Sequence, residues 1–196
     1  DTAGLSYTYA QLTDPAIVAL VPEDYAEVES VVWTDSDGAA LGRQVTVAPS
    51  IADFNDSWTV PGVVVKSATG MEETLDWDEM LGSDYLTENC TYGERYETTR
   101  TTDDVSFDVK YDLYTNCGAV DNVYGAVVAQ SDPPDQIVFI DFVAVNEADG
   151  EAFDVLLQSF SIDPDVLANA DAATAEAAAT TEAGAPAVNY VAITDD

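Results

Sequence analysis

The sequence of 196 residues contains no histidine. Histidine is the commonest general base and the commonest side-chain ligand of transition metals. Its absence excludes, within this chain, Ser-His-Asp catalysis, Cys-His catalysis and zinc hydrolysis through histidine ligands. We therefore expect a protein that is not an enzyme and that uses no cofactor and no metal.

Basic residues are also scarce, and their scarcity limits the possible partners. Five Lys and Arg stand against 38 Asp and Glu, which gives a formal net charge of −33. Binding to phosphate groups needs clustered cations, so we expect neither nucleic acid nor anionic lipid as a partner. High ionic strength or divalent ions would screen the repulsion among so many carboxylates. This charge fits a salt-adapted or acid-tolerant secreted protein, and it also fits extracellular proteins in general. The basic residues are Arg43, Lys66, Arg95, Arg100 and Lys110.

Only two cysteines are present, Cys90 and Cys117. An even number in an acidic, lysine-poor chain favours one disulfide and an oxidising compartment, although two buried free thiols are the alternative. No apolar run reaches the roughly 20 residues that a membrane-spanning helix needs. We therefore expect a secreted protein, located outside the cell or at its surface, without membrane insertion.

Hydrophobic residues make up 47% of the chain, enough for one domain with a substantial core. The composition divides the sequence into four segments. We expect an extended N-terminal arm at 1–13, a globular domain at 14–163, an Ala/Thr/Glu-rich linker at 164–185 and a strand-like tail at 186–196.

Alternating and helical patterns predict the elements of the globular domain. Apolar residues alternate with polar ones from Val105 to Leu113 within 99–117, which predicts a strand with one wet face. Residues 135–146 are apolar on both faces apart from Asp141, which predicts a central strand. Apolar residues at i, i+3, i+4 and i+7 predict an amphipathic helix at 147–160. The predicted fold class is α+β, a twisted, largely antiparallel sheet flanked by helices, with extended terminal arms.

Several stretches together resemble an extracytoplasmic bacterial domain of the PsbP/Mog1-like type. They are a Val-Pro-x-x-Tyr strand end, an Ala-Pro-Ser helix start before Phe54, the Trp-x-x-Pro-Gly-Val run and the pair Cys-Thr-Tyr and Asn-Cys-Gly. The resemblance covers about residues 14 to 162. Domains of this type accompany secreted protease, kinase or lipoprotein modules. The resemblance implies a non-catalytic bacterial module.

Carboxylates offer few specific sites. The Asp35–Gly38 stretch resembles the first half of a calcium loop, but Thr46 stands where the bidentate Glu should be, so a turn is the preferred reading. Asp141 lies within an apolar strand and needs a partner, because burying an unpaired carboxylate is costly. Lys110 or an arginine is the candidate.

The tail carries the main functional hypothesis. Residues 187–194 read as a strand, but a lone strand is unstable in water and must pair with a sheet edge. Pairing with another copy is β-strand exchange, and repeated head to tail it builds a filament. We expect a self-assembling structural protein.

The alternative is a monomeric accessory module that binds a ligand or another secreted protein. The N-terminal arm is the other possible donor, and docking within the chain or between chains stays open. The expected donor residues are Val188, Tyr190, Val191 and Ile193.

Overall fold

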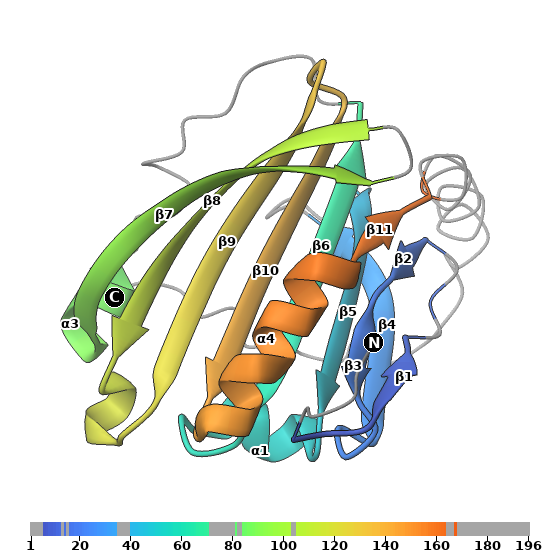
Figure 1. Ribbon diagram of the computed structural model, residues 1–196. Helices are drawn as coiled ribbons and strands as arrows, with labels where there is room; N and C mark the ends of the chain where they lie inside the picture. The colour runs from blue at the N-terminus through green and yellow to red at the C-terminus, as the bar shows by residue number, and fades with distance from the viewer. Residues whose placement is uncertain are drawn as a thin grey trace, which may run out of the picture.

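The computed structural model describes residues 6–12, 14, 16–34, 40–70, 81, 84–102, 105–163 and 167. At its centre is an antiparallel sheet of seven strands in the order β4-β5-β6-β10-β9-β8-β7 (Figure 1). The predicted α+β class with a largely antiparallel sheet is confirmed. The strands are β4 (Glu27–Thr34), β5 (Ala40–Ala48), β6 (Gly62–Thr69), β7 (Thr91–Thr102), β8 (Val105–Thr115), β9 (Val123–Asp132) and β10 (Gln136–Ala144). The helices are α1 (Ile51–Asp56), α3 (Asp84–Asn89), α4 (Glu147–Ser159) and the 3-10 helix η1 (Cys117–Ala119).

The sheet consists of two antiparallel meanders that meet in its middle. Strands β4 to β6 form the first meander, β7 to β10 form the second, and β6 pairs with β10. After β6 the chain crosses to the far edge of the sheet, where β7 begins. Strand β10 therefore occupies the centre of the order, which confirms the central strand predicted from its apolar faces.

Helix α4 lies across one face of the sheet (Figure 1). It begins at a capping box, in which the side chain of Asn146 accepts from the Asp149 backbone N–H and Asp149 accepts from the Asn146 backbone N–H. Phe153 and Leu156 are buried on its inner side, as is Phe160 at its C-terminal cap. The helical spacing in the sequence thus predicted this helix and its packed side.

Two small pairs of strands lie beside α4 on the same face (Figure 1). Strand β1 (Tyr9–Gln11) pairs with β3 (Leu20–Pro22), and β2 (Ile17–Val18) pairs with β11 (Ser161–Ile162). The described part of the expected N-terminal arm is therefore extended, but it pairs within its own chain. Leu167, inside the segment expected to be a linker, is buried in the core.

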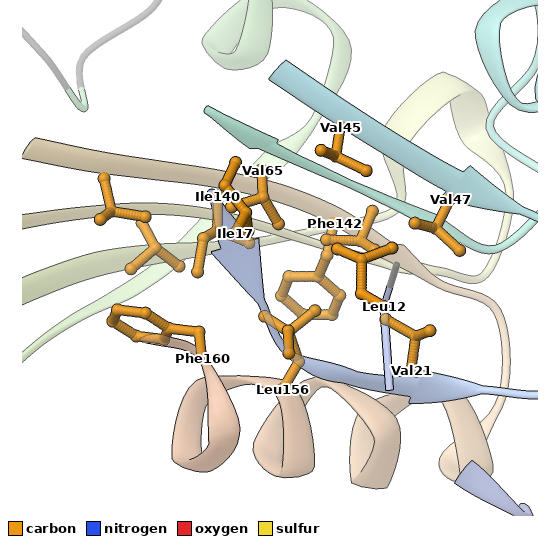
Figure 2. Packing of buried hydrophobic residues seen from close by; sticks show 14 of the residues in the cluster. Leu12, Ile17, Val21, Val45, Val47, Val65, Ile140, Phe142, Leu156 and Phe160 are labelled. Atoms are coloured by element: carbon orange, nitrogen blue, oxygen red, sulfur yellow. The ribbon is translucent and has the colours of Figure 1, made fainter. Parts of the chain in front are cut away.

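Apolar side chains from the sheet, α4 and these N-terminal strands form one core (Figure 2). Val45, Val65 and Ile140 come from the central strands and are fully buried. Ile17 from β2 and Phe160 meet them from the other layer. The apolar residues of β8, including Phe107 and Val109, point into this core. The core therefore lies on the side of the sheet that α4 covers.

Residues 99–117 contribute to two strands. The single strand expected at 99–117 is wrong, because β7 ends at Thr102 and β8 starts at Val105, where the two strands pair antiparallel. Apolar and polar residues alternate only from Val105 to Leu113, so the pattern identifies β8 and carries no signal for the separate strand before it. The apolar residues of the stretch ETLDWDEML, residues 73–81, also predict a helix, but of these residues the structure describes Leu81 alone.

Candidate functional site

The disulfide joins the C-terminal end of α3 to η1, which follows β8. Cys90 and Cys117 are bonded at an S–S distance of 2.10 Å, so the expected disulfide is present. Cys117 is buried in a small cluster with Leu86 and Tyr114, and Trp58 packs against it. Gly118 has φ +64°, and a Cβ there would lie 2.3 Å from Cδ1 of Trp58, so this turn requires glycine.

A cavity of about 440 Å³ opens next to this disulfide, on the sheet face opposite α4; we call it the disulfide-end cavity. Trp58 stacks on Tyr85 with ring centroids 6.1 Å apart and meets Tyr124 edge to face at 5.6 Å. Leu81 and Val64 add apolar surface. The only described acidic side chains that line it are Asp56 and Asp141.

Asp141 has different partners from those expected. Its Oδ1 accepts a 2.6 Å hydrogen bond from the Tyr124 hydroxyl, and its Oδ2 lies 3.9 Å from Nζ of Lys66. Lys110, the residue named as a candidate partner, instead lies 3.1 Å from Glu97. The strand register explains why Lys66 is the partner of Asp141. Asp141 pairs with Val64 on β6, and the next residue of β6 on the same face is Lys66. Burial first, and then the charge of Asp141, raises the pKa of Tyr124 well above its ordinary value.

The calcium interpretation receives no structural support. The Asp35–Gly38 stretch lies outside the described residues, and Thr46 is buried on β5. Within the described ranges, no group of three or more Cys, Asp or Glu side chains is placed to hold a metal ion.

A second hollow of about 580 Å³ lies on the α4 side, between α4 and strands β7 and β8; we call it the aromatic groove. Its walls are Tyr96 of β7 and Phe153 of α4, and its floor comes from β8, β9 and β10. Sequence reasoning missed this groove, because its walls come from elements that are far apart in the chain. The apolar lining residues are Tyr96, Tyr111, Leu113, Val123, Phe142, Ala144, Val145 and Phe153.

The sheet has two edges, β4 and β7. Among the described residues, β7 pairs with β8 alone, and from Thr91 to Thr101 every residue is exposed except the half-buried Arg95 and Arg100. A break in the register between Tyr92 and Arg95 leaves a regular stretch from Arg95 to Thr102. The sequence signal that could have found β7 is its run of β-branched threonines, Thr98, Thr99, Thr101 and Thr102. The expected donor residues Val188, Tyr190, Val191 and Ile193 lie outside the described residues.

No described helix is long and apolar enough to cross a membrane. No protein-family model matches the chain. No curated protein sequence matches it significantly either.

Proposed function

We propose that this chain is a non-enzymatic secreted protein that self-associates by adding its C-terminal strand to the β7 edge of another copy. The observation that carries the proposal is the long, exposed edge of β7. An open edge presents a row of backbone N–H and C=O groups to which an extended segment can pair. Repetition from copy to copy builds a fibre, since donor and acceptor are different surfaces.

The lengths of donor and acceptor agree. The regular part of β7, from Arg95 to Thr102, has eight residues, and so does the strand-like segment from Ala187 to Thr194. The register break at Tyr92 would stop an added strand at one end. The threonines of β7 are β-branched, which favours the extended conformation of the acceptor strand itself.

The two edges differ in charge, and the difference favours β7. Strand β7 carries two basic and two acidic residues, Arg95 and Arg100 with Glu94 and Glu97, whereas β4 carries Glu27 and Glu29 and no basic residue. The donor segment is followed by Asp195 and Asp196. An added segment that carries two aspartates would therefore be repelled more at β4 than at β7.

The tether permits docking onto a second copy. About 20 residues separate Leu167 from Ala187, and at full extension they span at most about 70 Å. This upper limit leaves room for docking on a second copy and also on β7 of the same chain. Self-association therefore has to be tested separately from strand docking.

Oligomeric state tests the proposal. Wild type, a variant lacking 184–196, Val191→Pro and the matched linker variant Thr180→Pro are compared by light scattering and electron microscopy. Proline removes a ladder hydrogen bond in a strand but not in a linker. We expect assemblies from wild type and Thr180→Pro, and monomers from the other two. The same particle size for all four proteins would exclude assembly through the tail.

Hydrogen exchange locates the acceptor. A synthetic peptide of residues 184–196 is added to the tail-deleted protein, and amide exchange is measured by mass spectrometry. We expect slower exchange in 95–102 and unchanged exchange in 27–34. Protection of 27–34 instead would assign the acceptor to β4.

The alternative is a monomeric accessory module that binds a ligand or a protein, as the resemblance to secreted bacterial domains implies. The aromatic groove favours it, because it is a large hollow of mixed apolar and acidic lining. The disulfide supports an oxidising, extracellular location under either proposal.

A further inference from the structure

The aromatic groove holds a continuous array of four rings. Tyr96 stacks on Tyr111 with centroids 4.9 Å apart and an interplanar angle of 15°. Tyr111 meets Phe153 edge to face at 6.2 Å, and Phe153 stacks on Phe142 at 3.6 Å. The rings come from β7, β8, α4 and β10, so the closed fold is needed to assemble them. Ring faces carry negative partial charge and attract cations.

The charged groups around these rings all have one sign. Asp121, Glu147 and Asp154 line the groove, and the Tyr96 hydroxyl donates a hydrogen bond to Glu94. None of the five basic residues lines it. The groove therefore lacks the internal countercharge that Lys66 supplies to Asp141 in the disulfide-end cavity.

The positions of the basic residues explain this asymmetry. Arg95 and Lys110 extend from the opposite face of the β7–β8 hairpin, where they contact Asp112 and Glu97. Arg100 is on the groove side but lies at the far end of α4, where it donates to the backbone oxygens of Leu157, Gln158 and Phe160. Its guanidinium carbon is 4.0 Å from the centroid of the Phe160 ring.

We propose that the aromatic groove is a binding site for a small organic cation, of the alkylated ammonium class. Methyl groups on nitrogen pack on aromatic faces, while the positive charge is attracted to the rings and to the carboxylates at the rim. The volume of about 580 Å³ falls within the usual range for small-molecule sites. This inference does not depend on strand addition at β7.

The ionisation of Tyr111 agrees with a site of negative potential. Burial first, and then the charges of Asp154 and Glu94, raises the pKa of Tyr111. The ring therefore stays neutral at physiological pH. A hard inorganic cation fits the groove less well, because its aromatic walls replace little of the oxygen coordination that such an ion prefers.

Calorimetric titration tests the proposal on the full chain. Choline chloride is compared with 3,3-dimethylbutan-1-ol, a neutral molecule of the same shape, with ionic strength held constant by NaCl. We expect choline to bind and the neutral alcohol to bind at least about tenfold more weakly. Equal binding of the two, or no binding of choline at 50 mM, would overturn the proposal.

Variants locate the site and separate it from the overall negative charge. Asp154→Asn should weaken choline binding about 3- to 10-fold, while Asp108→Asn, the same charge change on the opposite face, should leave it unchanged. Tyr96→Leu removes an exposed ring and should weaken binding without unfolding, which circular dichroism verifies. An equal effect of the two aspartate variants would show nonspecific attraction and contradict the site. Unchanged binding by Tyr96→Leu would contradict the aromatic wall.

Discussion

The Arg95 guanidinium and the Asp112 carboxylate form a bidentate salt bridge between the neighbouring strands β7 and β8. Nε of Arg95 lies 2.7 Å from Oδ1 of Asp112, and Nη2 lies 2.8 Å from Oδ2. The residues are direct partners in the β7–β8 register, and the Asp112 side chain is 2% exposed. The pair therefore holds the edge strand in its register at the point where the register break ends.

Removing this arginine should destabilise the β7 edge. Arg95→Ala leaves the Asp112 carboxylate buried without its main partner, and we expect a loss of about 3 kcal/mol in the free energy of unfolding. Arg95→Lys keeps the charge but not the fork geometry, so an intermediate loss is expected. Urea unfolding measures both. Stability equal to wild type in Arg95→Ala would contradict the structural role of the pair.

Acid should weaken the fold through Asp14. Its Oδ1 accepts from the backbone N–H groups of Ala16 and Ile17 at 2.8 and 3.0 Å, and its Oδ2 accepts from Ser30 and Arg43 at 2.6 and 3.0 Å. Burial works to raise the pKa of Asp14, but these hydrogen bonds, with that of Ser30 first, outweigh it and hold the pKa below its ordinary value.

Because the folded pKa lies below the unfolded value of about 3.9, this stabilisation is present above about pH 4 and is lost as the pH falls further. Asp14→Asn should cost about 3 kcal/mol at pH 7. The difference from wild type should shrink below pH 4 in denaturant titrations at several pH values. Exposed Asp135→Asn is the control and should change little. A difference that does not vary with pH would show that the Asp14 charge is not involved.

The disulfide should contribute strongly to stability. It closes a loop with a sequence separation of 27 residues, for which loop-closure entropy gives about 3.5 kcal/mol. The double variant Cys90→Ser/Cys117→Ser should lower the melting temperature by about 7–14 °C. Differential scanning calorimetry measures the shift, and a thiol assay on wild type verifies the bond. An unchanged melting temperature would mean that the loop is already constrained without it.

Salt should stabilise the protein. With a net charge of −33, the folded chain concentrates repelling carboxylates, and ions screen that repulsion. Each kcal/mol of repulsion removed should raise the melting temperature by about 2–4 °C. Melting curves in 0.05, 0.5 and 2 M KCl test this, with sucrose as the uncharged control. A flat or falling response would argue against salt adaptation.

The sequence predicted those elements of the fold whose pattern depends only on residues close together in the chain. The alternation from Val105 to Leu113 assigned the buried face of β8, and the spacing of Phe153 and Leu156 predicted α4. Both periods are short and follow directly from backbone geometry. The count of two cysteines favoured the bond between Cys90 and Cys117.

Composition alone also showed that this sequence contains no histidine and only five basic residues, which needs no structure to be known. Tertiary structure decided what depends on strand order. The partnership of Asp141 with Lys66 and the gathering of Tyr96, Tyr111 and Phe153 arise from pairings between distant segments. The register of such pairings depends on the packing of the whole core, which local patterns do not contain.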